Sequence, residues 1–400
     1  MYHMKQEEQQ LIHLLKEALT PDQEERQPLD LSEKALDRVI DLAGKHSVLS
    51  LLYDRLMELP LTNEQEHVVR RTAERVAQQN YHLLFLAKYL TGLFEEEQIA
   101  AVLLKGSVTA SYYPVPELRK SGDVDLFVSD QADPARIRVL LMQHGIKEQS
   151  KQHANHHISF DSPDGITIEI HTELIEQTGK KQLDSYVKAN RNICLQHRVK
   201  KEVMGIELYS FDDAYQAYFL LIHMVEDFLR AGFGLKLLCD WVVVWNHGME
   251  EGEKQTFLRL VTESGIYGFA RMITAVCVQY LGLKEEPVAF LMESEPIERM
   301  KVESFFCDVL EAEEFGRSGK ERMVVLQQGG LAGLVREFQH QVQLTYPNAS
   351  KHWICMPVLW VMLFFGFLHR NRTLRKVSTW EVIKSARKRG RQAEQMDLFE

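Results

Sequence analysis

The chain has 400 residues, of which 45% are hydrophobic and 26% are charged, a composition that is ordinary for a folded protein and excludes extensive disorder. This length exceeds what one compact core usually holds, so we expect two or three structural units. Asp and Glu outnumber Lys and Arg by 57 to 47, and the resulting net charge of -10 argues against a general binder of nucleic-acid backbone.

The first region of the chain, residues 1–97, is predicted to be helical. Apolar residues recur there at helical spacing, as in Leu11, Leu14 and Leu15. A break is expected near Pro21, because proline disfavours a continuing helix. We therefore expect a set of separate helices before residue 98.

The middle region, residues 98–210, changes to a mixed pattern. Short apolar runs and alternating apolar and polar residues indicate strands, with one helix between the second strand and the third. The expected strands are Ile99–Leu104, Val124–Val128, His157–Phe160 and Ile166–Ile170, and the expected helix is Pro134–His144. The predicted fold class is α+β, with a small mixed-sheet core flanked by helical regions on both sides in the sequence.

Residues 211–400 return to helical spacing and are predicted to form a C-terminal helical region. Within it, Trp353–Leu368 is strongly apolar but has only 16 residues and contains Pro357, whereas a membrane span needs about 20 residues. The next segment, His369–Arg391, carries nine Lys or Arg side chains and one Glu. We favour a buried helix followed by a solvated basic helix over contact with a membrane surface.

The turn at Gly106-Ser107, directly after the first expected strand, is the first candidate site feature. A helix is expected to start there and to continue through Tyr112. Backbone N–H groups at a helix start, together with the Ser107 hydroxyl, can hold a phosphate. Gly-Ser turns are common, so this turn alone does not assign a function.

Asp123 and Asp125 form the second feature. They flank Val124 in an expected strand, so both carboxylates point to one face while Val124 and Leu126 enter the core. Two carboxylates this close repel each other unless a cation lies between them, and oxygen ligands of this kind suit Mg²⁺. From these residues alone, a solvated pair of aspartates at a strand edge is an equal alternative.

Glu169 supplies a third carboxylate in the alternating segment Ile166–His171. The isoleucines are expected in the core, and Glu169 shares the other face with Thr167 and His171. If this strand lies beside the strand of Asp123, the three carboxylates can hold two Mg²⁺ or Mn²⁺ ions, one at an acceptor hydroxyl and one at a leaving pyrophosphate.

The segments Leu103–Val128 and Ile168–Leu174 resemble the polymerase-β-type nucleotidyltransferase superfamily, and more closely its bacterial branch of uncharacterised nucleotidyltransferase family proteins. The superfamily pattern is Gly-Ser, a gap, Asp-x-Asp between apolar residues and a later strand carboxylate, and all parts occur here in that order. The gap between Ser107 and Asp123 holds 15 residues, longer than is usual in the wider superfamily, and we interpret it as a loop. The third carboxylate is Glu169, where aspartate is commoner.

The resemblance implies a metal-dependent nucleotidyltransferase that moves a nucleoside monophosphate from an NTP to an acceptor and releases pyrophosphate. Asp123 and Asp125 would then be catalytic and bind both metal ions, and Glu169 would bind one. Ser107 and the Gly106 backbone would hold the terminal phosphates. These implied roles agree with the chemistry expected from the residues themselves.

Lys105 and Arg119 are the candidates for neutralising triphosphate charge, because cationic groups near a transferred phosphate stabilise its developing charge. The sequence leaves three further roles open. His171 is placed to touch a substrate from beside Glu169. His223 and Asp240 resemble positions in the helical region of the family, and a buried histidine satisfied by a carboxylate explains them as well as nucleotide contact does.

Four histidines, His153, His156, His157 and His171, raise the question of a zinc site. Their spacing fits no compact tetrahedral set, and no cysteine lies near them in sequence. We therefore interpret them as histidines at strand edges.

The expected compartment is a reducing cytoplasm. The five cysteines are far apart without a C-x-x-C pair, and residues 1–10 lack the pattern of a secretory signal. The expected partners are an NTP and an acceptor that is a small molecule, a peptide or a protein. The alternative function is a catalytically silent nucleotide-binding or scaffold protein in a biosynthetic complex, which would bind an NTP without forming pyrophosphate.

Overall fold

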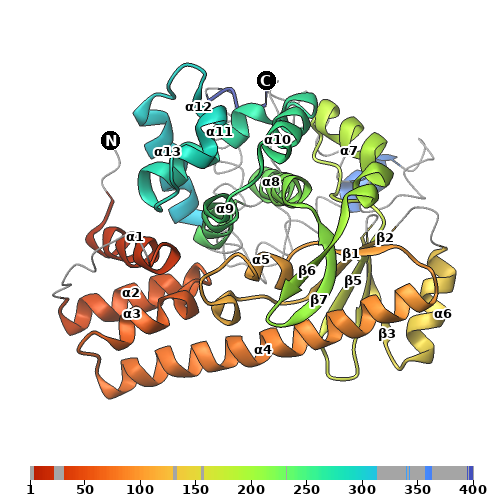
Figure 1. Ribbon diagram of the computed structural model, residues 1–400, viewed down its shortest axis with the longest axis horizontal. Coiled ribbons are helices and arrows are strands. Elements are labelled where there is room, and N and C mark those ends of the chain that lie inside the picture. The colour runs from red at the N-terminus through yellow and green to blue at the C-terminus, as the bar shows by residue number, and fades with distance from the viewer. Residues whose placement is uncertain are drawn as a thin grey trace.

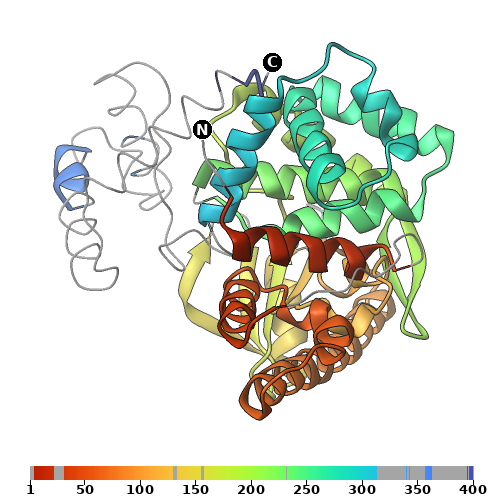
Figure 2. The same ribbon diagram turned by 90° about the vertical axis from the view of Figure 1, so that its left-hand side faces the viewer.

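The computed structural model describes residues 4–21, 31–128, 133–154, 157–230, 232–312, 339, 342, 356–362, 394 and 396–399. A five-stranded mixed sheet and a two-stranded hairpin lie between two groups of helices, which confirms the predicted α+β class. Figure 1 shows the long helix α4 on one side of the sheet and the C-terminal helices on the other. Figure 2 shows the first helix in contact with the C-terminal helices.

The N-terminal region is helical in the described residues, as predicted. Its elements are α1 (Gln6–Leu19), α2 (Glu33–Lys45), the 3-10 helix η1 (Leu49–Leu52), α3 (Tyr53–Met57) and α4 (Asn63–Glu96). Helix α4 begins at a capping box, in which the Thr62 hydroxyl accepts from Gln65 N at 3.3 Å and the Gln65 side chain accepts from Thr62 N at 3.0 Å. This reciprocal cap fixes the start of a helix of 34 residues that reaches across to the sheet.

The sheet has the strand order β1-β2-β5-β4-β3. Its strands are β1 (Ala101–Leu103), β2 (Val124–Val128), β3 (Lys147–Ala154), β4 (His157–Asp161) and β5 (Thr167–His171), and α6 (Pro134–Gln143) lies between β2 and β3 in the chain. Strands β2 and β5 are parallel, and the other three neighbouring pairs are antiparallel. All four expected strands are present. Strand β3 was not expected, because its sequence KEQSKQHA is polar on both faces and forms an edge.

The two faces of the sheet have different neighbours. One face is apolar, and its side chains form a buried cluster with apolar residues of α4 and α6; the cluster includes Val124, Leu126, Ile168, Ile170, Leu84, Phe94, Ile137 and Leu141. The other face carries Asp125, Glu169 and His171, the residues that alternate with those apolar ones. The period of two thus separates a packed face from a polar one.

A two-stranded hairpin follows α7 (Lys181–Cys194) and was not among the expected strands. It consists of β6 (Arg198–Val203) and β7 (Ile206–Phe211), and β7 lies against β1 and α4. The two residues of the turn, Met204 and Gly205, have φ values of +48° and +77°, as in a tight hairpin turn. The apolar residues of β6 are few, which hid the strand in the sequence pattern.

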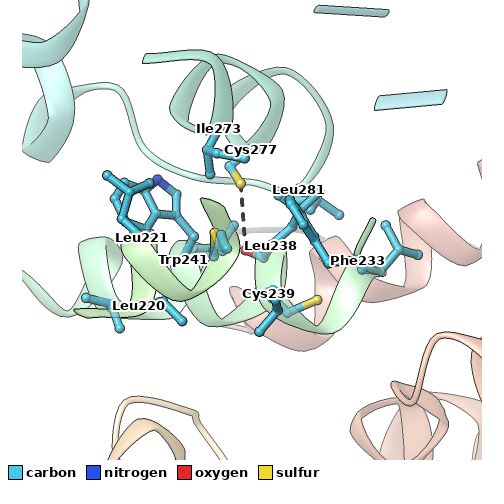
Figure 3. Close-up of a cluster of buried hydrophobic side chains, with 14 of the residues drawn as sticks. Leu220, Leu221, Phe233, Leu238, Cys239, Trp241, Ile273, Cys277 and Leu281 are labelled. Carbon is cyan, nitrogen blue, oxygen red and sulfur yellow. Dashed lines mark hydrogen bonds between the residues drawn. The ribbon is translucent and has the colours of Figure 1, made fainter. Parts of the chain in front are cut away.

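The C-terminal region is helical as far as Ala312, in agreement with the prediction. Its helices are α8 (Asp213–Arg230), α9 (Leu235–His247), α10 (Glu251–Glu263), α11 (Tyr267–Tyr280), α12 (Ala289–Met292) and α13 (Arg299–Ala312). Figure 3 shows Leu221 of α8 and Trp241 of α9 packed below Ile273 and Cys277 of α11. The Cys277 thiol donates to the Leu238 carbonyl at 3.6 Å. This large apolar core holds α8 and α9 in fixed positions.

The predictions for Trp353–Leu368 and His369–Arg391 fall almost entirely outside the described residues, which include 356–362 alone in this part of the chain. Among the helices that the structure describes, none has both the length and the apolar character needed to cross a membrane.

Candidate functional site

Three carboxylates meet where β2 and β5 lie side by side. Asp125 on β2 is in register with Glu169 on β5, and Asp123 directly precedes β2. One oxygen from each side chain lies within 4.8 Å of the chosen oxygens of the other two. The parallel pairing of β2 and β5 brings the predicted metal ligands together, and we call Asp123, Asp125 and Glu169 the carboxylate cluster.

Asp125 is the most buried member of the cluster. Lys105 Nζ lies 3.4 Å from its Oδ2, and His171 Nε2 lies 3.1 Å from its Oδ1. Burial opposes ionisation, but Lys105 and His171 outweigh it and hold the pKa of Asp125 well below its usual range. Asp125 Oδ2 is buried and accepts no hydrogen bond from the described residues. Asp125 therefore has an oxygen that is paired with Lys105 but keeps spare capacity to accept a further ligand.

Glu169 is flanked by two histidines. Its Oε2 lies 3.3 Å from His171 Nε2, and its Oε1 lies 3.6 Å from His157 Nε2. Burial disfavours a charged imidazole, yet the hydrogen bonds to Asp125 and Glu169 raise the pKa of His171 to about 9. Burial also disfavours charge on Glu169, but its bond with His171 lowers its pKa. At neutral pH, His171 therefore carries positive charge between two carboxylates.

Asp123 has the opposite shift. The charge of Asp125 and burial raise the pKa of Asp123 to about 6, against the attraction of Lys105. Lys236, in the first turn of α9, also attracts Asp123 electrostatically and favours its charged form. The sequence did not single out Lys236, because nothing in the pattern of α9 distinguishes it from a solvated lysine.

The Gly106 turn lies beside the cluster. Gly106 has φ +65° and ψ -112°, a conformation that other residues adopt only with strain. A Cβ added to Gly106 would lie 3.7 Å from the Asp123 carbonyl oxygen, so the turn and the start of β2 are in contact. The helix that follows, α5 (Ser107–Ala110), ends before Tyr112, contrary to the expectation of a longer helix. The Ser107 side chain is buried in the turn.

Arg119 occupies a buried framework rather than an open position. Its Nε and Nη2 donate to the two carboxylate oxygens of Asp240, each at 2.7 Å, and Nη1 donates to the Gly106 carbonyl at 3.3 Å and to Ser121 Oγ at 3.0 Å. The Tyr113 hydroxyl donates to Asp240 at 2.7 Å. Burial disfavours the charged guanidinium, but Asp240 outweighs it and raises the pKa of Arg119. The expectation that Arg119 faces a triphosphate therefore differs from its observed contacts, which are with protein groups.

The segment between the turn and β2 is well packed. The Asn80 side chain of α4 donates to the carbonyls of Glu117 and Arg119, both at 2.7 Å, where the 3-10 helix η2 (Pro116–Leu118) ends. The Ser50 hydroxyl donates to the Leu118 carbonyl at 2.6 Å. The long gap between the Gly-Ser turn and the Asp-x-Asp strand is thus an ordered loop held by α4 and η1.

The sequence model of a protein family described as "Uncharacterised nucleotidyltransferase" matches residues 32–282, more than half of the chain. The chain belongs to this family. The matched residues of this nucleotidyltransferase family member include the carboxylate cluster, the Gly106 turn and helices α8 to α11. The family membership therefore covers both the sheet and the first four helices of the C-terminal region.

A solved structure, of an antigenic nucleotidyltransferase-like protein from Paracoccidioides brasiliensis, is similar to part of this family member. The two chains are 13% identical, and the similarity covers 50% of this chain and 93% of that chain with a TM-score of 0.31. A score this low carries no argument about fold or function. No curated protein matches the chain.

Helix α8 brings titratable groups towards the cluster from the C-terminal region. His223 Nε2 lies 3.4 Å from Asp227 Oδ2, and its Nδ1 lies 3.8 Å from Glu226 Oε2. His223 interacts electrostatically with Asp125, and Asp227 with Lys105. His223, interpreted from the sequence as a buried histidine satisfied by a carboxylate, is half-buried and pairs with Glu226 and Asp227 of its own helix, whereas Asp240 pairs with Arg119.

The donor set of the carboxylate cluster suits a hard divalent cation such as Mg²⁺. Its three groups are carboxylates, the ligands that Mg²⁺ prefers in proteins. Lys105 and a protonated His171 offset two of the three negative charges, so the cluster retains negative charge. Together with the unsatisfied oxygen of Asp125, this charge fits the binding of a metal ion.

Proposed function

We propose that this family member transfers a nucleoside monophosphate from an NTP to an acceptor hydroxyl or phosphate, with release of pyrophosphate. The observation that supports the proposal is the convergence of the carboxylate cluster from two parallel strands, directly beside the Gly106 turn. Family membership supports the same reaction class. A phosphate held at this turn lies next to carboxylates that bind a divalent cation.

The carboxylate cluster would hold the metal ions. Bound Mg²⁺ or Mn²⁺ supplies charge that offsets the phosphate oxygens and lowers the pKa of an acceptor hydroxyl. Asp123 and Asp125 would contact both ions, and Glu169 the one on the acceptor side. Asp125 is ionised at neutral pH because of its neighbouring cations, so it needs no proton loss before binding a metal ion.

The triphosphate would lie between the Gly106 turn and α9. Gly106 N–H and the Ser107 hydroxyl are the donors of the turn, and Lys105 and Lys236 add positive charge from two sides. Because α5 is a single turn, its dipole contributes little, and binding depends on the individual N–H and O–H donors.

Arg119 would act as a positioning residue. It joins the Gly106 carbonyl to Asp240, and Asp240 lies one helical turn after Lys236 on α9. The Arg119 guanidinium therefore fixes the phosphate turn relative to the helix that supplies Lys236. This arrangement keeps the two phosphate-binding elements at a constant separation.

The acceptor in this proposal is a small molecule, a peptide or a protein. The net charge of -10 disfavours a nucleic-acid acceptor. The proposed location is the cytoplasm, since Cys194, Cys239 and Cys277 are buried thiols outside any disulfide.

The test is incubation of the purified chain with each α-labelled NTP, Mg²⁺ or Mn²⁺ and a cell extract. Label is expected to enter a product, with release of pyrophosphate, for the unmodified chain and not for Asp123→Asn or Asp125→Asn. Asp164→Asn, in the exposed turn between β4 and β5, is the matched control and should remain active. An NTP that binds without yielding pyrophosphate would contradict transfer and support a catalytically silent nucleotide-binding or scaffold protein.

A further inference from the structure

Two histidines and one carboxylate converge on the side of β5 that faces β4. His157 on β4 is the cross-strand partner of His171 on β5, and their ring centroids are 5.1 Å apart. Glu169 lies two residues before His171 and therefore on the same face of the sheet. One donor atom from each of the three lies within 4.8 Å of the others. The antiparallel pairing of β4 and β5 thus creates a cluster that the spacing in the sequence did not predict.

The separations in this cluster fit one bound metal ion. A tetrahedral ion with ligands at ~2.0–2.1 Å holds neighbouring donor atoms ~3.3 Å apart. His171 Nε2 lies 3.3 Å from Glu169 Oε2, and His157 Nε2 lies 3.6 Å from Glu169 Oε1. The two imidazoles thus approach the two oxygens of one carboxylate at separations close to this value, and one donor atom from each of the three residues lies within 4.8 Å of the others.

We propose that His157, Glu169 and His171 bind a transition-metal ion such as Zn²⁺ or Co²⁺ at a site adjacent to the carboxylate cluster, and that the ion replaces the proton that His171 Nε2 holds between Asp125 and Glu169 in the metal-free chain, which is released to solvent. Imidazole nitrogen favours these ions over Mg²⁺, which prefers oxygen ligands. Two histidines and one glutamate leave a fourth position of a tetrahedral ion open, as in catalytic zinc sites.

Glu169 belongs to both sites. A metal ion held by the histidines changes which oxygens Glu169 presents to the carboxylate cluster, so the two sites are coupled through one side chain. An effect of this coupling on nucleotide transfer rests on the proposed function. Binding of the transition metal does not, because it requires only the three side chains and the pairing of β4 with β5.

The test uses the full chain with Co²⁺ and Zn²⁺ as probes. Visible absorption of Co²⁺ reports nitrogen ligands in a tetrahedral site, and calorimetry measures Zn²⁺ affinity. We expect the unmodified chain and Asp123→Asn to show the same strong Co²⁺ bands. His157→Ala should lose the bands and bind Zn²⁺ more than ~100-fold more weakly. Removal of a residue that only hydrogen-bonds to a metal ligand typically lowers metal affinity by ~10- to 100-fold, so the larger loss would indicate direct binding. His82→Ala, at an exposed position on α4, is the matched control and should match the unmodified chain.

A second variant, His157→Asp, keeps a ligand at the same position and carries the test if His157→Ala does not fold. It is expected to bind Zn²⁺ more weakly than the unmodified chain and to shift preference towards Mn²⁺, because oxygen replaces nitrogen. The proposal is wrong if His157→Ala keeps the Co²⁺ bands and the Zn²⁺ affinity, or if Asp123→Asn abolishes the bands. Strong bands in a chain that never releases pyrophosphate would overturn the proposed function and leave the metal site standing.

Discussion

The carboxylate cluster and the Arg119–Asp240 pair are two buried groups of charges in one protein, and their charges are balanced differently. Arg119 and Asp240 match one for one through two hydrogen bonds of 2.7 Å. In the cluster, three carboxylates lie beside two paired cations, Lys105 and His171, so among these five groups negative charge is in excess. A matched pair holds the loop to α9, whereas an unmatched cluster retains attraction for a cation. The balance of charge therefore distinguishes the Arg119–Asp240 pair, which stabilises the fold, from the carboxylate cluster, which is proposed to bind metal ions.

The largest expected effect is on activity, from Asp125→Asn. The change removes the central ligand of the cluster, so the rate of nucleotide transfer is expected to fall by about 10³-fold or more. Loss of one group that stabilises transition-state charge typically lowers kcat by about 10²- to 10³-fold. Pyrophosphate release, measured with the NTP that the unmodified chain uses, checks this result. Asp164→Asn serves as the control, and a loss of less than tenfold in Asp125→Asn would contradict the assignment of Asp125.

The next effect is on stability, from Arg119→Ala. Removal of the guanidinium leaves Asp240 buried without its main partner, so the free energy of unfolding is expected to fall by about 3–5 kcal/mol. Urea unfolding monitored by circular dichroism measures it. The matched control is Arg136→Ala, whose ion pair with Glu97 is exposed and is expected to contribute ~0–1 kcal/mol. If the free energy of unfolding fell equally in Arg119→Ala and Arg136→Ala, the buried pair of Arg119 and Asp240 would not be a main contributor to stability.

Gly106→Ala acts on the turn between the two groups of charges. At φ +65° and ψ -112°, a side chain introduces strain of about 1–3 kcal/mol, which either destabilises the chain or distorts the phosphate turn. Thermal unfolding and the KM for NTP would both report the change. Gly92→Ala in α4, where an added Cβ meets nothing within 4 Å, should instead stabilise the chain slightly. A stable, fully active Gly106→Ala would contradict the proposed turn.

The smallest expected effect is a gain in stability from Asp123→Asn. Because the folded state raises the pKa of Asp123 to about 6 from 3.8, its charged form destabilises the fold above pH 6. Replacement by Asn should raise the free energy of unfolding by about 1–2 kcal/mol at pH 7.5, after allowance for solvent screening. The gain should shrink below pH 6 and vanish near pH 4. Urea unfolding of the variant and the unmodified chain at pH 7.5 and at pH 4 tests this. A difference in the free energy of unfolding that is the same at both pH values would contradict the raised pKa of Asp123.

The strands and the long helices could be predicted from the sequence because their patterns are local. Alternation around Val124 and Ile168 identified β2 and β5, and it assigned Asp125 and Glu169 to the polar face. Strands β3 and β6 were missed because polar residues dominate their sequences, and β7 was missed together with its hairpin partner β6. The helix at Ser107 was predicted too long, because apolar spacing continues to Tyr112 although the helix ends at Ala110.

By itself, the sequence determined the fold class and which carboxylates share a face, because the two-residue period of a strand operates between near neighbours. The tertiary structure alone decided which strands pair, that Arg119 meets Asp240, that His157 approaches Glu169, and that Lys236 acts electrostatically on Asp123. These contacts join residues far apart in the chain, and their positions depend on strand register and on the packing of α8 and α9. A local pattern carries no information about such distances.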